Sequence, residues 1–294
     1  MKDGQTKRMP EEYMSEVIDT GRIEKLEYMT CSYDEKNLKL KKELNVYLPK
    51  GYGTDKRTKY NILYLMHGGG ENQNTLFGGP GENLELKNIL DHMIDKQEIE
   101  PLIVVTPTFY VEEGEDFIFR AKNFYQELIH DVIPLIEGKY NTYTESVTKK
   151  GMIDTRNHRA FGGFSMGSCC TWSVFLHCIE YFRDYMPLSG DCWELGMKGG
   201  FEHSKETAEL LAEAARKSGY QKEDYNLYCS TGSEDIAYVN MLPQIEEMKK
   251  FTDVFTFTED GMDGNLTFWV SEGKTHWWHY VNEYIYHTLP FLFQ

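Results

Sequence analysis

The clearest signal of the fold is Gly163-Phe164-Ser165-Met166-Gly167 (GFSMG), near the middle of the 294-residue chain. It matches the pattern G-x-S-x-G, which is typical of a sharp turn between a strand and a helix with serine at its tip. Side chains two positions before and after the tip would collide with the chain, and glycine occupies both places. The turn raises the serine hydroxyl out of the sheet and places it at a helix N-terminus, which favours negative charge. A chance glycine-rich turn is the alternative interpretation.

The segments around this turn alternate between strand-like and helix-like patterns. Alternating polar and apolar residues predict two early antiparallel strands, and continuous apolar runs predict buried strands that follow them. We therefore expect an α/β fold with a mostly parallel central sheet and helices on both faces. Residues 21–294 are predicted to form one domain, preceded by a loosely ordered extension at 1–20. The expected strands are 23–31, 38–48, 61–66, 101–106, 159–164, 184–188, 225–230 and 266–270, and the expected helices are 84–94, 119–140 (kinked or broken at Pro134), 166–179, 204–218, 238–250 and 277–289.

The charge balance limits the kinds of partner. The chain has 31 Lys and Arg against 47 Asp and Glu, a formal net charge of −16. Such a surface repels phosphate backbones and anionic lipid headgroups, which argues against nucleic acid and membrane partners and favours a neutral or weakly charged substrate. No run approaches the roughly 18–20 apolar residues that a membrane span needs. The cysteine and acidic residues show no metal-site spacing, so no metal and no cofactor are expected.

A serine nucleophile needs a base, and the base needs a carboxylate that orients it and stabilises its cation. In folds with this turn the chain order is serine, acid, histidine, and the histidine follows the last strand. His276 directly follows the run at 266–270 and is the predicted base for Ser165. His279 lies one helical turn further on and is an alternative; His203 precedes a predicted helix and His287 lies deep in one.

The acid is less narrowly determined by position. Asp235 lies in the loop after the predicted strand 225–230, which is the expected place. Its neighbour Glu234 can instead be a solvated surface residue. Asp191 follows the preceding strand and is the rival, because some hydrolases with this turn take their acid there. Position alone favours Asp235 and leaves both alternatives open.

A tetrahedral intermediate needs preorganised N–H donors. One is expected from Met166, the residue after the nucleophile. The other is expected from the loop His67-Gly68-Gly69-Gly70, which follows a buried strand and has the H-G-G-G composition of esterases and lipases. Gly69 is the predicted second donor and Gly70 the next candidate. We expect His67 to orient the loop; a merely flexible turn is the alternative.

These motifs together resemble the feruloyl esterases of carbohydrate esterase family 1, in the esterase D-like branch of the α/β-hydrolases. The chain is especially similar to the esterase modules attached to clostridial xylanases. The resemblance extends from about residue 40 to the end. The segments that carry it are 64–72 (YLMHGGGEN), 101–109 (PLIVVTPTF), 161–167 (FGGFSMG), 186–193 (MPLSGDCW), 231–238 (TGSEDIAY) and 275–286 (THWWHYVNEYIY).

The resemblance implies that Ser165 is the nucleophile, Asp235 the acid and His276 the base. It also implies hydrolysis, through an acyl-enzyme, of the ester that joins ferulate to arabinose side chains of xylan. The expected partner is feruloylated arabinoxylan or a xylo-oligosaccharide. The alternatives are an acetylxylan esterase, a general carboxylesterase, an S-formylglutathione hydrolase, or a carbohydrate-binding protein that has lost its chemistry.

A phenolic acid needs an aromatic or apolar slot with a few polar groups. Trp193, close to Asp191, and Trp277, next to His276, are the candidates, although either tryptophan could be a core residue; Gly70 and Asp191 are further candidate substrate contacts. The acidic stretch 110–119 could change which ester is accepted. The preferred hydroxycinnamate and the oligomeric state are left open. So is the compartment, because the resemblance implies secretion whereas residues 1–14 have no apolar leader.

Overall fold

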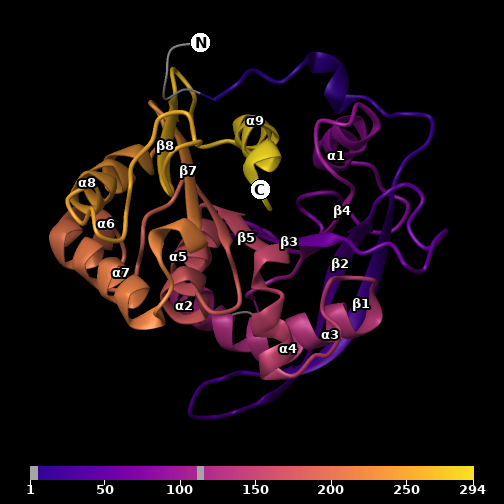
Figure 1. Cartoon of the computed structure of the whole chain (residues 1–294), viewed down its shortest axis with the longest axis horizontal. Coiled ribbons are helices and arrows are strands. Elements are labelled where there is room, and N and C mark those ends of the chain that lie inside the picture. Colours follow the sequence, from indigo (N-terminus) through magenta and orange to yellow (C-terminus); the bar gives the residue numbers. More distant parts are fainter. Residues whose placement is uncertain (1–5, 111–115) are drawn as a thin grey trace.

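The computed structural model describes residues 6–110 and 116–294. Within these residues, eight strands form one sheet in the order β1-β2-β4-β3-β5-β6-β7-β8 (Figure 1). The antiparallel hairpin β1–β2 adds to β4, and every pairing from β4 to β8 is parallel. This is the predicted α/β-hydrolase fold. The strands are β1 (Arg22–Cys31), β2 (Lys39–Leu48), β3 (Asn61–Met66), β4 (Leu102–Thr106), β5 (Arg159–Phe164), β6 (Asp184–Leu188), β7 (Asn226–Gly232) and β8 (Leu266–Ser271).

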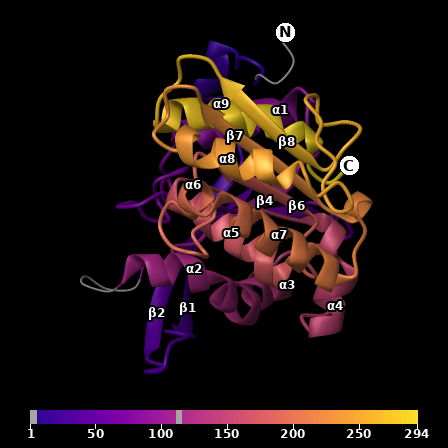
Figure 2. The same ribbon diagram turned by 90° about the vertical axis from the view of Figure 1, so that its left-hand side faces the viewer.

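Helices cover both faces of the sheet, because the central strands are buried on both sides. One apolar cluster joins one face to α2, α3, α5, α7 and α8, and the other joins the opposite face to α1 and α9. Figure 2 shows these two layers above and below the sheet. The helices are α1 (Glu85–Asp95), α2 (Phe117–Glu127), α3 (Ile133–Lys139), α4 (Lys149–Asp154), α5 (Met166–Cys178), α6 (Gly199–Glu202), α7 (Ser204–Ser218), α8 (Tyr238–Met248) and α9 (Trp278–Thr288). In the described part of the chain, no helix combines the length and apolar character that crossing a bilayer requires.

The interruption expected in the helix over 119–140 lies just before Pro134, because α2 is followed by a π-helical turn (Leu128–Val132) and α3 then begins with Pro134 in its first turn, where a missing N–H costs nothing. One local expectation differs from the structure. The extension expected to be loose buries Met9 and Tyr13. Tyr13 stacks on His92, with ring centroids 4.9 Å apart, and its hydroxyl donates to Glu98 at 2.8 Å. Of the acidic stretch 110–119, residues 111–115 lie outside the described residues.

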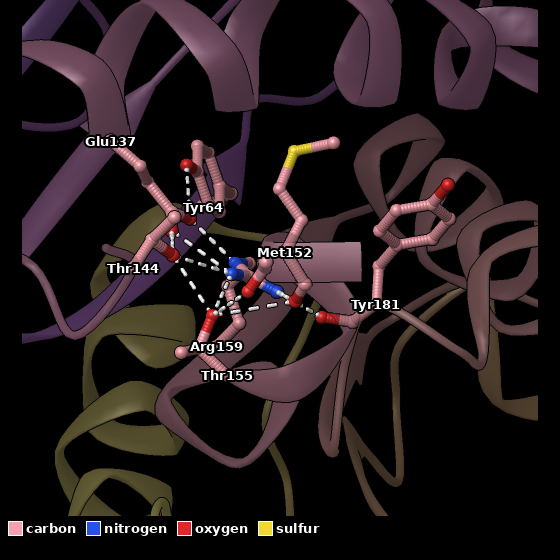
Figure 3. Close-up of polar contacts among 8 residues, drawn as sticks. Tyr64, Glu137, Thr144, Met152, Thr155, Arg159 and Tyr181 are labelled. Atoms are coloured by element: carbon pink, nitrogen blue, oxygen red, sulfur yellow. Dashed lines mark hydrogen bonds and ion pairs between the residues drawn. The ribbon is translucent and has the colours of Figure 1, made fainter. Parts of the chain in front are cut away.

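A buried ion pair holds the end of β5 that lies opposite the GFSMG turn (Figure 3). The Arg159 guanidinium donates to both carboxylate oxygens of Glu137, at 2.5 and 2.9 Å, and both side chains are 1% exposed. Arg159 also donates to the carbonyl oxygens of Met152 and Tyr181 and to the hydroxyls of Thr144 and Thr155. Its bonds therefore join β5 to the segments that surround its first residue.

Replacing Arg159 with methionine is expected to lower the free energy of unfolding by about 3–5 kcal/mol, because Glu137 would remain buried without a cation. Urea denaturation at pH 7 measures this loss. Arg216 makes the same two-bond contact with Asp253 at 2.7 and 2.9 Å, but at the exposed surface. Arg216→Met is the matched control and should cost less than about 1 kcal/mol. Equal losses in the two variants would contradict the stabilising role of the buried pair.

Candidate active site

Ser165 lies at the tip of the turn between β5 and α5. Its backbone has φ 56° and ψ −114°, and its N–H donates to the Leu188 carbonyl oxygen at 2.9 Å. The two flanking glycines are required by space. A Cβ on Gly163 would lie 2.5 Å from the backbone of Gly167, and a Cβ on Gly167 would lie 2.4 Å from the Met66 carbonyl oxygen. The crowding expected from the G-x-S-x-G pattern is therefore present.

The structure brings Ser165, His276 and Asp235 into one hydrogen-bonded series. The Ser165 Oγ lies 2.9 Å from His276 Nε2, and His276 Nδ1 lies 2.7 Å from Asp235 Oδ1. The Asp235 side chain is fully buried, whereas that of His276 is 21% exposed. With Nδ1–H donating to the carboxylate, Nε2 is left to accept the hydroxyl proton. This geometry can generate a serine alkoxide and hold the resulting imidazolium beside a carboxylate.

The sheet topology explains why residues distant in sequence meet. Ser165, Asp235 and His276 follow β5, β7 and β8, which are parallel strands, so their carboxyl ends lie at one edge. The Asp235 carboxylate is further held by the Ala237 N–H, which donates to Oδ1 at 2.7 Å. The loop after β7 therefore holds the Asp235 carboxylate in place independently of its contact with the His276 imidazole.

The rival positions are engaged elsewhere or exposed. Asp191 accepts from the Trp193 indole at 3.1 Å and from the Gly200 N–H at 2.9 Å, so its two oxygens point to those groups. Burial raises the pKa of the Asp191 carboxyl. Glu234 is exposed at the surface. Among the alternative histidines, His279 lies 3.8 Å from Glu85, His287 accepts from the Lys7 N–H, and His203 is exposed.

The glycine-rich loop after β3 lies against the serine turn. A Cβ on Gly69 would lie 2.9 Å from Met166 Sδ, so these two expected donors are neighbours. Neither the Gly69 N–H nor the Met166 N–H donates a hydrogen bond to another described residue. The Gly70 N–H, in contrast, donates to the Tyr110 hydroxyl at 2.7 Å. Gly69 and Met166 are therefore better placed than Gly70 to receive an oxyanion.

The buried His67 side chain holds the glycine-rich loop in place. Its ring nitrogens lie 2.7 Å from the Gly68 carbonyl oxygen and 2.7 Å from the Thr108 hydroxyl, and the side chain is completely buried. Burial lowers the pKa of His67 to about 4, and the nearby Lys42 ammonium acts in the same direction. The ring is thus neutral in the folded protein at pH 7. These contacts fit the loop-orienting role expected from the sequence.

Acid is expected to destabilise the protein through His67. In the unfolded chain the His67 imidazole takes up a proton below pH 6.5, whereas in the folded chain it does so only near pH 4. The free energy of unfolding therefore falls by roughly 3 kcal/mol between these two pH values and stays level below them. His67→Gln should flatten the fall between pH 7 and pH 4.5 in urea titrations. Part of it should remain, because burial lowers the pKa of His287 to about 4 as well. His203→Gln, at an exposed histidine, is the control; an unchanged slope in His67→Gln would contradict this origin.

A cavity of about 370 Å³ opens beside Ser165 and His276. Trp193 and Asp191 line it, as expected for a substrate slot. Trp277 does not line it and is 62% exposed. An apolar wall of the cavity, formed by Ile236, Val239 and Met197, was not predicted from the sequence. The apolar residues that closely follow Asp235 are the signal that could have identified it. The full lining is Ser165, Ser189, Gly190, Asp191, Trp193, Met197, Lys198, Ile236, Ala237, Val239, Asn240 and His276.

Known proteins share this chain's sequence and fold. A family model described as "Putative esterase" matches residues 36–279. Endo-1,4-beta-xylanase Y of Acetivibrio thermocellus is 48% identical over 97% of this chain, which corresponds to 24% of that relative. The endo-1,4-beta-xylanase/feruloyl esterase of Xylanibacter ruminicola is 33% identical over 50% of this chain and 19% of its own length. The chain thus spans about a quarter or less of these relatives.

Solved structures agree with these matches. A mutant of the feruloyl esterase module from Clostridium thermocellum, complexed with sinapinate, is 47% identical over 99% of this chain and 94% of that one, with a TM-score of 0.86. The ferulic acid esterase of Anaeromyces mucronatus is 18% identical, covers 99% of this chain and 98% of that one, and has a TM-score of 0.68; it supports the fold alone. The resemblance to clostridial xylanase modules is confirmed, and the chain belongs to the esterase family whose model matches residues 36–279.

Proposed function

We propose that this protein is a serine carboxylic-ester hydrolase that releases ferulate and related hydroxycinnamates from the arabinose side chains of xylan. The observation that carries the proposal is the Ser165–His276–Asp235 series beside an open cavity. The 47% identity to a feruloyl esterase module supports the choice of acyl group. The activities of the longer xylanase relatives belong to those proteins.

The geometry supports a two-step acyl transfer. Ser165 Oγ attacks the ester carbonyl carbon while His276 Nε2 accepts the hydroxyl proton. The carbonyl oxygen gains negative charge and is received by the N–H groups of Gly69 and Met166. The carbon–oxygen bond to the sugar breaks, and His276 gives its proton to the departing sugar oxygen. Water, deprotonated by His276, then attacks the acyl-enzyme, and Ser165 recovers its proton as the acid is released.

The cavity favours a flat aromatic acyl group over acetyl. Its volume of about 370 Å³ lies within the range of small-molecule sites, and Trp193, Ile236 and Val239 supply an aromatic and apolar lining. An acetyl group would leave most of this space without a partner. Burial of a hydroxycinnamoyl ring should contribute roughly 1.5–3 kcal/mol, equivalent to about 10–150-fold in kcat/KM.

The test compares kcat/KM for methyl ferulate, methyl sinapate and nitrophenyl acetate, and measures acid release from feruloylated arabinoxylan. We expect free ferulate from the polysaccharide and a clear preference for the methyl hydroxycinnamates after correction for the reactivity of the nitrophenyl group. A preference for acetyl would redirect the proposal to an acetylxylan or general esterase. Binding of xylo-oligosaccharides without turnover of any ester would refute the proposed esterase activity.

A further inference from the structure

A carboxylate outside the hydrogen-bonded series ties together two loops of the site. Glu71 Oε2 accepts the Gly68 N–H at 2.7 Å, and Glu71 Oε1 accepts the indole N–H of Trp278. Gly68 belongs to the glycine-rich loop after β3, whereas Trp278 is the first residue of α9, two positions after His276. One partly buried side chain therefore bridges the loop of the oxyanion donors and the segment that carries the base.

The Trp278 ring extends this bridge to the reacting groups. Its ring lies against Phe164, with centroids 4.6 Å apart, and Phe164 in turn packs on the His276 imidazole at 4.5 Å. Phe164 is also the residue before Ser165. The Glu71 contact with the indole thus holds an aromatic stack whose other end is the imidazole.

Gly69 has no side chain that could fix its backbone, and glycine is the residue most free to rotate. Its two neighbours are restrained instead: the Gly68 N–H is held by Glu71, and the Gly70 N–H is held by the Tyr110 hydroxyl at 2.7 Å. A Cβ on Gly68 would lie 3.0 Å from Glu71 Oε2 and 3.4 Å from the Ser165 Cβ, so the loop fits closely between them. The Gly68–Gly69 peptide itself is held at its carbonyl oxygen, which lies 2.7 Å from His67 Nδ1, while Glu71 holds the peptide before it. Loss of the Glu71 contact would leave the direction of the Gly69 N–H dependent on the His67 contact alone.

We propose that Glu71 is a positioning residue of the oxyanion hole, which fixes the Gly69 N–H toward Ser165 and joins this loop to Trp278. The inference rests on the esterase activity proposed above. An oxyanion exists in the tetrahedral intermediate but not in the bound ester, so a disordered donor lowers kcat and leaves KM nearly unchanged. A substrate-binding role for Glu71 would instead raise KM.

Three single variants and one double variant test the bridge in the full chain. Glu71→Ala removes both hydrogen bonds of the Glu71 carboxylate. Glu71→Gln keeps the side-chain volume but places an amide NH₂ group, which is itself a donor, against one of the two N–H donors. Trp278→Phe removes the indole donor alone. Since loss of one oxyanion donor costs about 10²–10³-fold in kcat, loss of its positioning should cost about 10–100-fold in Glu71→Ala. Trp278→Phe should cost less, and Glu71→Ala/Trp278→Phe should match Glu71→Ala, because both substitutions break one bridge.

A matched control exists in the following loop. Glu82 accepts the Gly79 N–H at 2.7 Å, the same three-residue spacing as Glu71 and Gly68, but it is exposed. Glu82→Gln should leave kcat and KM unchanged. If Glu71→Ala fails to fold, as judged by circular dichroism, Glu71→Gln supplies the measurement.

Ligand binding separates positioning from a general loosening of the site. An aryl boronate adds to the serine oxygen as a tetrahedral anion and needs the oxyanion donors, whereas a neutral hydroxycinnamyl alcohol has no acyl oxygen and needs the slot alone. We expect Glu71→Gln to weaken boronate binding by the same factor as kcat and to leave binding of the alcohol unchanged. Equal weakening of both ligands, or kcat within twofold of wild type in both Glu71 variants, would overturn the proposal.

The same measurements test the role of Glu71 separately from the identity of the proposed substrate. If the wild-type protein hydrolyses nitrophenyl acetate but not methyl ferulate, the acyl-group assignment fails while Glu71 is still tested on the acetyl ester. If it hydrolyses neither, the boronate affinities of wild type and Glu71→Gln still decide whether Glu71 orders the donors.

Discussion

Replacing Ser165 with alanine is expected to lower kcat for methyl ferulate by about 10⁴–10⁶-fold, the loss seen when a serine nucleophile is removed from such a series. The physical reason is that His276 Nε2, 2.9 Å from the hydroxyl in the native protein, would have no nucleophile to deprotonate. Residual turnover would come from the N–H donors and from water. Single-turnover assays with methyl ferulate measure the loss, and isothermal titration with ferulate should show that the slot still binds.

Ser168→Ala is the matched control for this experiment. Ser168 lies three residues further along α5 and donates a buried hydrogen bond to the Gly190 carbonyl oxygen at 2.7 Å. Its removal should cost about 1 kcal/mol of stability and leave kcat within a few-fold of wild type. A Ser165→Ala variant with kcat within tenfold of wild type would exclude Ser165 as the nucleophile.

Asp235→Asn is expected to lower kcat by about 10⁴-fold while the fold is retained. The carboxylate accepts from His276 Nδ1 at 2.7 Å, which keeps the proton on that nitrogen and leaves Nε2 as the base. An asparagine amide can donate to Nδ1 instead, which reverses the tautomer and protonates the nitrogen that must accept the serine proton. Steady-state kinetics at saturating methyl ferulate measure the loss.

Two neighbouring acids serve as comparisons for Asp235. Glu234→Gln changes an exposed carboxylate and should leave kcat unchanged. Asp191→Asn should act on substrate binding, because Asp191 lines the cavity and its oxygens accept from Trp193 and Gly200. A severe kcat loss in Asp191→Asn together with full activity in Asp235→Asn would transfer the role of the acid to the loop after β6.

The elements that place Ser165 were predictable because they depend on local rules. The paired glycines of the turn, the buried strand before it and the helix after it are all encoded within a few residues of one another. The choice between Asp235 and Asp191 was not local. Both follow buried strands, and only the order β6-β7-β8 puts the loop after β7 next to the loop that carries His276.

Trp277 shows why adjacency in sequence misleads. Its backbone is extended, with φ −149° and ψ 136°, and successive side chains of an extended segment point to opposite sides. With His276 directed at Ser165, Trp277 faces solvent. The cavity wall that replaces it comes from Ile236, in the turn before α8, and Val239, in the first turn of that helix, where no periodic pattern marks a residue as facing a ligand.

The backbone at Ser165 has a consequence for any attempt to engineer this enzyme. A non-glycine residue at φ 56° and ψ −114° costs about 1–3 kcal/mol, which the surrounding packing must overcome. Glycine at the tip of the turn would recover part of that free energy and abolish the nucleophile. Heat resistance and turnover therefore compete at this position, and a library selected only for survival at high temperature would accumulate robust but inert proteins.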